Sequence, residues 1–219
     1  VFALLGGLVV DFGASAELFI SLGKYSITVI VGLLIMILFV YPIILMIFTK
    51  VKYLDFFKGI SPAQMLAFST SSSAATLPVT MERCEDHLGV SDEVSSFVLP
   101  LGATINMDGT SLYQAVAAVF IAQAYGLDLD MEQQLTIVLT ATLASIGAAA
   151  VPGAGMVMLV IVLGAIGVPS EGLALIFGVD RILDMMRTVV NVTGDATVAT
   201  VVASSEGQLR DVTDEELMS

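Results

Sequence analysis

The sequence has little charge. Only 13% of its 219 residues are Asp, Glu, Lys or Arg, whereas 57% are hydrophobic, and the mean hydropathy is +0.95. An ordinary soluble domain is about 25% charged and about 45–50% apolar. Because a soluble fold of this composition would expose large apolar patches to water, we predict an integral membrane protein in contact with the lipid bilayer.

Other scarcities exclude whole classes of function. The eight Lys and Arg residues form no basic patch, which argues against a nucleic-acid partner. One cysteine, Cys84, and one histidine, His87, supply neither an internal disulfide nor a zinc cluster. We expect His87 to be a surface residue and Cys84 to be neither a ligand nor a nucleophile. The acidic stretches 82–93 and 206–217 are expected to be solvated. No enzyme and no organic cofactor are predicted.

The first 58 residues, 1–58, are predicted to hold the end of one transmembrane helix and one complete transmembrane helix. Residues 25–49 carry no charge, and about 20 apolar residues span a bilayer. Pro42 is expected to kink this helix. Three lysines follow within 50–58, and the positive-inside rule places such a short loop in the cytoplasm.

Two apolar segments are interrupted by small residues, at STSSSAATLP (69–78) and at GAAAVPGAG (147–155). Each is followed by a helix that carries Asn-x-x-Gly, at 106–109 and at 191–194. Paired interruptions in two halves are typical of inverted-repeat secondary transporters; two ordinary kinked hairpins without function are the alternative. The predicted transport core, 59–204, contains a re-entrant hairpin (59–90), a broken helix (94–127), a second re-entrant hairpin (131–168) and a polar-striped helix (171–204), and an acidic cytoplasmic tail (205–219) follows.

The last predicted helix carries a polar stripe. At about 100° per residue, five polar side chains project within an arc of roughly 80°. Ionisable groups at membrane depth are costly, so they indicate a functional site, although a stripe can also join helices structurally. The stripe consists of Asp180, Asp184, Arg187, Asn191 and Asp195.

Arg187 suggests the chemistry of the substrate. A guanidinium fork matches a carboxylate in two parallel hydrogen bonds, and Asp184 on the same face can receive an ammonium group. Helix N-termini at the two small-residue tips favour a second carboxylate. This arrangement suits a zwitterion with an extra carboxylate. The alternative is a closed Asp184–Arg187 ion pair that only holds the helix in place.

Asp108 and Asp195 suggest the coupling ion. Neither has Lys or Arg at helical spacing, and a buried carboxylate without such a partner binds a cation or a proton. With Asn106, Asn191 and unwound carbonyls such as that of Gly102, they offer oxygen ligands that suit a hard cation. Na⁺ and H⁺ both remain open at this point.

Four motifs carry a family resemblance. SSSAATLPVT, LPLGATINMDGT, SIGAAAVPGAG and LDMMRTVVNVTGD, in this order over residues 70–195, resemble the glutamate transporter family of dicarboxylate/amino acid:cation symporters, and bacterial glutamate/aspartate symporters in particular. The resemblance implies an all-α integral membrane protein with an inverted-repeat elevator core, two re-entrant helical hairpins and two discontinuous transmembrane helices. It also implies a multi-pass protein of the cell inner (plasma) membrane with a cytoplasmic C-terminus, and a homotrimer formed through an N-terminal half that this sequence lacks.

The resemblance also implies ligands, which map onto this sequence residue by residue. The substrate contacts would be Ser71, Ser72, Ser73, Thr110, Val151, Pro152, Gly153, Ala154, Gly155, Asp184, Arg187, Thr188 and Asn191. The sodium ligands would be Gly102, Thr104, Asn106, Asp108, Ser145, Ile146, Ala148, Asn191 and Asp195, where Ala148 replaces a threonine of some relatives and acts through its carbonyl.

Three positions depart from the family pattern. Gln114 stands where animal members have a glutamate, which puts potassium antiport in doubt. Ser71 stands where some archaeal members have an arginine. Arg181 is an additional cation, and we expect it to neutralise Asp180 or Asp184.

The expected function is secondary active symport of an acidic amino acid, glutamate or aspartate, with Na⁺ or H⁺. The second hairpin is expected to be the gate. Symport of C4-dicarboxylates or neutral amino acids, or an ion channel, remain as alternatives. Asp184 argues against a dicarboxylate, because that substrate has no ammonium group, and Arg187 argues against a neutral amino acid.

Overall fold

A computed structural model describes residues 16–212, and the regular secondary structure of this part is helical apart from one isolated bridge between Val90 and Leu209. The all-α prediction is confirmed for these residues. The predicted helix end at 1–10 and the end of the acidic tail lie outside the described part. The elements are α2 (Ala16–Ile35), η1 (Met36–Val40), α3 (Tyr41–Phe48), α4 (Tyr53–Thr70), α5 (Ser73–Glu82), η2 (Arg83–His87), α6 (Asp92–Ile105), α7 (Asp108–Ala124), α8 (Met131–Ile146), α9 (Ala154–Ala165), η3 (Ser170–Gly172) and α10 (Leu173–Ser205).

Elements α2, η1 and α3 form one long helix. By length and composition, Phe19–Phe48 is the one helix of the described chain that could cross a membrane, with a mean hydropathy of 3.0. Its π-helical turn η1 lies directly before Pro42, and the Tyr41 N–H bonds to the Met36 carbonyl. Proline has no N–H to continue the α-helical ladder, and the π-turn lies at this point of the helix.

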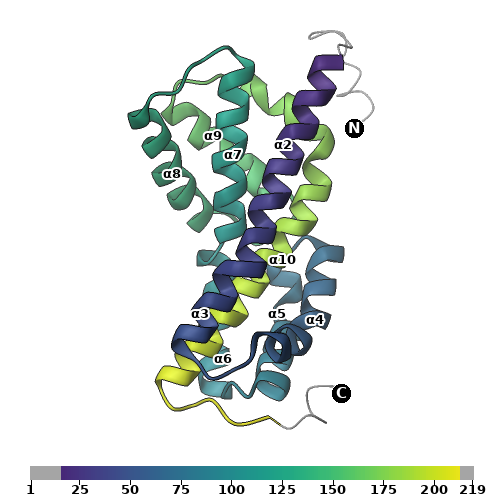
Figure 1. The fold of residues 1–219 in the computed structure, drawn as a ribbon, viewed down its shortest axis with the longest axis vertical. Coiled ribbons are helices and arrows are strands. Elements are labelled where there is room, and N and C mark those ends of the chain that lie inside the picture. The colour runs from purple at the N-terminus through teal and green to yellow at the C-terminus, as the bar shows by residue number, and fades with distance from the viewer. Residues whose placement is uncertain (1–15, 213–219) are drawn as a thin grey trace.

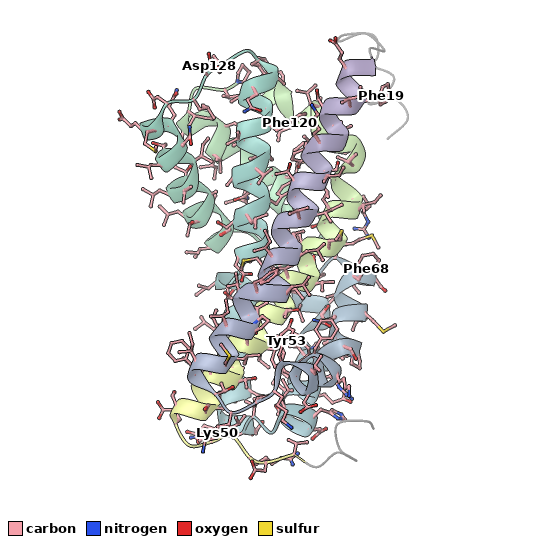
Figure 2. The ribbon with its side chains drawn as sticks, viewed as in Figure 1. Phe19, Lys50, Tyr53, Phe68, Phe120 and Asp128 are labelled. Atoms are coloured by element: carbon pink, nitrogen blue, oxygen red, sulfur yellow. The ribbon has the colours of Figure 1, made fainter. Side chains whose placement is uncertain are left out.

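The molecule has two lobes (Figure 1). Hairpin 1 (α4 and α5) lies with α6 in the lower lobe, and hairpin 2 (α8 and α9) lies with α7 in the upper lobe. The long α2–α3 helix and α10 run through both. Lys50 and Asp128 lie at opposite ends of the long axis, as the predicted topology requires (Figure 2).

The two predicted broken helices differ. The first is interrupted, because Asn106 and Met107 separate α6 from α7. The second prediction is wrong: α10 is continuous over 33 residues, through Asn191 and Gly194. A Cβ atom at Gly194 would lie 2.9 Å from Asn106 Nδ2, so this glycine permits close packing and does not unwind its helix.

The stretch 82–93 is not simply solvated. Cys84 is fully buried in the lower core, and His87 is only 6% exposed, so the expectation of a surface histidine is wrong. The Arg83 Nε donates to the Gly59 carbonyl at 2.7 Å, which joins η2 to α4. The π-helical turn folds this polar sequence back onto hairpin 1, an effect of tertiary packing that its composition does not reveal.

Candidate functional site

The polar stripe of α10 faces the protein interior. Its five side chains are all buried, although four of them are ionisable groups. Burial at this level requires partners from other elements, because an isolated charge in such a place is unfavourable. The exposed fractions are 2% for Arg187, 3% for Asp195, 4% for Asn191, 5% for Asp184 and 8% for Asp180.

Arg187 is the centre of an ionic network. Its Nη2 donates to Asp184 Oδ1 at 2.5 Å, and its Nη1 lies 3.8 Å from Asp180 Oδ1. Its Cζ lies 4.0 Å from the ring centroid of Tyr113, a cation–π contact. The Tyr113 hydroxyl in turn donates to Asp180 Oδ1 at 2.6 Å. One tyrosine therefore holds both the guanidinium and its second carboxylate.

In the part of the chain that the structure describes, Arg181 forms no direct ion pair with Asp180 or Asp184. Its side chain is exposed, and between residues 16 and 212 its guanidinium forms no ion pair. Asp180 and Asp184 are both paired with Arg187 instead. At about 100° per residue, position 181 projects well away from the stripe that contains 180, 184 and 187.

Hairpin 2 contributes backbone donors through its tip, residues 147–153. The Gly153 N–H donates to Asp184 Oδ2 at 2.9 Å, so Asp184 is held by Arg187 and by this tip together. Gly153 caps the N-terminus of α9 with φ 78°, a conformation that favours glycine. The Gln114 Nε2 donates to the Gly155 carbonyl at 2.9 Å and so joins α7 to α9.

Hairpin 1 meets hairpin 2 through its own tip, residues 71 and 72. Ser71 has φ 53°, and Ser72 caps α5 by accepting from the Ala75 N–H at 3.1 Å. The Ser72 hydroxyl donates to the Ala150 carbonyl at 2.7 Å, and the Ala74 N–H donates to the same carbonyl at 3.3 Å. The two tips are therefore in direct contact.

A small cavity lies between the tips and α10. Its volume is about 20 Å³, which is room for one water molecule. Two buried polar atoms at this cavity, Ser71 Oγ and Arg187 Nη1, have no hydrogen-bond partner within residues 16–212. Of the expected substrate contacts, Ser72, Pro152 and Gly153 do not line the cavity. Those that do are Ser71, Ser73, Thr110, Val151, Ala154, Gly155, Asp184, Arg187, Thr188 and Asn191.

The two carboxylates without basic partners lie where α6, α7 and α10 meet. The Asn106 Nδ2 donates to Asp195 Oδ1 at 2.9 Å. The Gly109 N–H donates to Asp108 Oδ1 and to Asn191 Oδ1, each at 2.9 Å. Within the described chain neither Asp108 nor Asp195 forms an ion pair. The oxygen-rich surroundings fit a hard cation.

The other expected sodium ligands differ in their position relative to these two carboxylates. A Cβ atom at Gly102 would lie 2.7 Å from Asp195 Oδ1, so the backbone and the carboxylate are adjacent. The Gly102 carbonyl is not unwound as expected, because it accepts the Asn106 N–H at 2.8 Å. Ser145 and Ile146 line a cavity of about 440 Å³ together with Asn106 and Asp108.

Two expected ligands stand apart from these carboxylates. Thr104 is exposed, and its hydroxyl donates to the Leu101 carbonyl at 3.0 Å. Ala148 packs against Met107 in a small apolar cluster.

Sequence reasoning missed two tyrosines. Tyr41 is only 2% exposed, and its hydroxyl donates to Asp108 Oδ2 and to the Val190 carbonyl at 3.0 Å. Tyr113 orders Asp180 and Arg187 as described above. Tyr41 could have been found from its hydroxyl group, which lies within the uncharged segment 25–49. A buried tyrosine usually has a hydrogen-bond partner, so a polar contact could have been predicted there.

Comparisons with known proteins show which family the chain resembles. The model of the sodium:dicarboxylate symporter family matches residues 1–205. Excitatory amino acid transporter 2 of Mus musculus is 53% identical over 182 residues, which is 83% of this chain and 32% of that protein. Excitatory amino acid transporter 3 of Mus musculus is 53% identical over 180 residues, 82% of this chain and 34% of that protein.

An excitatory amino acid transporter of Caenorhabditis elegans is 48% identical over 202 residues, which is 92% of this chain and 40% of that protein. The chain thus spans about a third of the length of the curated relatives it matches. The family model covers almost the whole chain, including every element of the site. The chain therefore belongs to the sodium:dicarboxylate symporter family.

Proposed function

We propose that this chain is the substrate- and ion-binding part of a secondary active symporter of acidic amino acids, glutamate or aspartate, coupled to Na⁺ or H⁺. The observation that carries the proposal is the buried Asp180–Asp184–Arg187 network at the meeting point of two helix tips. The names of the matched excitatory amino acid transporters support the same substrate class.

The substrate's side-chain carboxylate is proposed to bind Arg187. Within the described chain, the Arg187 Nη1 and the Ser71 hydroxyl are buried donors that have no hydrogen-bond partner. A substrate carboxylate would accept a hydrogen bond from each of them. The substrate ammonium is proposed to bind Asp184, which then exchanges its bonds to Arg187 and Gly153 for the ligand. The remaining proposed contacts are the substrate set named from the sequence.

Hairpin 2 is proposed to be the gate. A cavity of about 20 Å³ is too small for an amino acid, so binding requires one of the tips to move. Moving the tip of hairpin 2 breaks the Gly153–Asp184 hydrogen bond and the hydrogen bond from Ser72 to the Ala150 carbonyl. The movement also frees Asp184 for the substrate. Closure around the ligand then restores contacts between the tips.

The coupling cation is proposed to bind at Asp108 and Asp195, with Asn106, Asn191 and nearby carbonyl oxygens. These oxygen groups suit Na⁺, and a proton on either carboxylate is the alternative. The other expected ligands are proposed to reach the cation when the tip of hairpin 2 rearranges. They are Thr104, Ser145, Ile146 and Ala148.

The whole protein is proposed to be a homotrimer in the inner (plasma) membrane, in which this part moves as an elevator. The hairpins would be re-entrant, with the Lys50 end and the C-terminus in the cytoplasm and the Asp128 end outside. The opposite positions of Lys50 and Asp128 support this orientation (Figure 2). The predicted division into 1–58, 59–204 and 205–219 is part of this proposal.

Uptake of labelled aspartate by the full-length protein in liposomes tests the function. The Na⁺ gradient and the pH gradient are imposed separately, and we expect saturable uptake driven by one of them. Competition by glutamate, succinate and serine then ranks the acidic amino acids against dicarboxylates and neutral amino acids. A current that needs no substrate, without saturable uptake, would contradict the symporter and favour a channel.

Arg187→Cys is expected to abolish aspartate uptake. Removing one partner of a buried charge pair costs about 2–5 kcal/mol, so a loss of at least about 30-fold is expected. Serine uptake should be spared or gained, which also reports that the variant folds. Arg181→Cys is the matched control on the exposed face of α10 and should keep aspartate uptake. Unchanged aspartate affinity in Arg187→Cys would refute the assignment.

A further inference from the structure

The chain does not leave the protein when α10 ends. After Ser205 it turns at Gly207, which has φ 69°, and then runs antiparallel to the segment between η2 and α6. The Arg210 N–H donates to the Gly89 carbonyl at 2.8 Å, and the Ser91 N–H donates to the Gln208 carbonyl at 3.2 Å. We call residues 206–212 the clasp.

Side chains of the clasp hold two helix ends. The Arg210 Nη2 donates to the carbonyls of Asp86 at 3.0 Å and Glu85 at 3.4 Å, which belong to the C-terminal part of η2. A cation is favourable at that end of a helix. The Gln208 Oε1 accepts from the Ser91 hydroxyl at 2.5 Å, and Ser91 is the N-cap of α6.

Gly89 is required by the clasp for two reasons. Its φ of 74° favours glycine, and a Cβ atom there would collide with the backbone oxygen of Arg210. The segment opposite the clasp is therefore built for a close backbone approach, and not for an exposed loop.

The clasp joins the elements on which the proposed site depends. It fixes the end of α10, which carries Asp184 and Arg187, to the base of hairpin 1 and to the start of α6. Hairpin 2 has no contact with the clasp among the hydrogen bonds of residues 16–212. The two hairpins thus differ in what holds them to α10.

We propose that the clasp is a conformational lock that keeps hairpin 1 attached to α10 throughout transport, so that only hairpin 2 opens. The part of this inference that concerns transport rests on the proposed function, whereas the lock itself is a property of the folded chain. Gln208 and Arg210 are positioning residues, because they act on the site only through η2, α6 and α10.

Hydrogen exchange on the purified full-length protein tests the lock without any uptake measurement. Arg210→Ala should speed amide exchange in residues 83–95 about tenfold, the factor that loss of a charge-assisted hydrogen bond implies for local opening. Exchange in hairpin 2, residues 131–165, should not change. Asp211→Ala, at the exposed neighbouring position, is the matched control and should match the wild type. Unchanged exchange at 83–95, or an equal increase in both hairpins, would overturn the proposal.

A reversible cross-link gives the second test. Val90 and Leu209 form a non-hydrogen-bonded antiparallel pair, for which Cα atoms lie about 4.5 Å apart, within the range of a disulfide. In the Val90→Cys/Leu209→Cys variant, oxidation should leave aspartate uptake unchanged and should restore slow exchange when Arg210→Ala is also present. Uptake that falls on oxidation and returns on reduction would show that the clasp must open. Absent uptake in the wild type would refute the symporter, whereas the exchange results would still decide the lock.

Discussion

Hairpin 1 and hairpin 2 present similar small-residue tips to the same buried arginine, but their surroundings differ. Hairpin 1 is joined to η2 at its base, where Arg83 donates to the Gly59 carbonyl. Along its arm it is joined to α10 by Gln64, whose Nε2 donates to Thr193 Oγ1 at 2.9 Å. Hairpin 2 is flanked by open volume instead, with cavities of about 820 Å³ towards α2 and about 440 Å³ towards α6.

The difference shows that two hairpins with similar tips can have different surroundings. Both tips place helix N-termini near Arg187, because both are built from small residues. Freedom to move depends on contacts along the arms, and α8 buries fewer of its residues than α4 does. The anchors along hairpin 1 therefore favour hairpin 2 as the moving part.

Joining the two tips should have the largest effect. Ser72→Cys and Ala150→Cys place two thiols at the contact between the tips, where the Ser72 hydroxyl now donates to the Ala150 carbonyl. Oxidation should reduce aspartate uptake to the level of empty liposomes, because hairpin 2 can no longer separate from hairpin 1, and reduction should restore it. The oxidised clasp pair, Val90→Cys/Leu209→Cys, is the control that should transport. Equal uptake before and after oxidation of the tip pair would remove the distinction between the hairpins.

Backbone strain in the tip of hairpin 2 should have an intermediate effect on aspartate binding. Gly153→Ala puts a side chain at φ 78°, which costs about 1–2 kcal/mol and corresponds to a factor of about 5–30. We expect aspartate affinity, measured by calorimetry, to weaken by this factor, because the closed tip becomes less stable. Gly147→Ala in the same tip has φ −88° and should bind like the wild type. Equal affinities for the two variants would argue against closure of this tip as part of binding.

Thiol labelling should give the smallest signal at hairpin 1. Cys84 is fully buried, and burial raises the pKa of its thiol, so little reactive thiolate forms at neutral pH. A maleimide should therefore label native Cys84 very slowly, also when the pH is raised from about 7 to about 8. A cysteine at Glu132, an exposed position at the start of hairpin 2, should react rapidly. Rapid labelling of Cys84 in the folded wild type would mean that hairpin 1 opens as readily as hairpin 2.

Much of the site followed from residue types and order. The stripe on α10 could be predicted because helical periodicity places 180, 184, 187, 191 and 195 on one face, and burying them requires an interior polar site. The interruption at Asn106 was predicted from a polar run within apolar sequence. The corresponding element, Asn-x-x-Gly at 191–194, lies within the continuous α10.

The failures have a common physical cause. Arg181, His87 and the carbonyl of Gly102 were interpreted from their neighbours in sequence, whereas their surroundings are set by other helices. Arg181 lies on an exposed side of α10, and His87 is buried when η2 folds onto hairpin 1. Tyr41 and Tyr113 were missed for the same reason, because their partners Asp108 and Asp180 are 67 residues away in each case.

The sequence alone determined that this is a helical membrane protein with two interrupted hairpins, a buried arginine and carboxylates without basic partners, because hydropathy and helical periodicity are local properties of the chain. Only the tertiary structure decided which carboxylates pair with Arg187, that α10 stays continuous, and that residues 206–212 pair with the segment between η2 and α6. These features arise from contacts between residues far apart in the chain, and local sequence patterns do not specify such contacts.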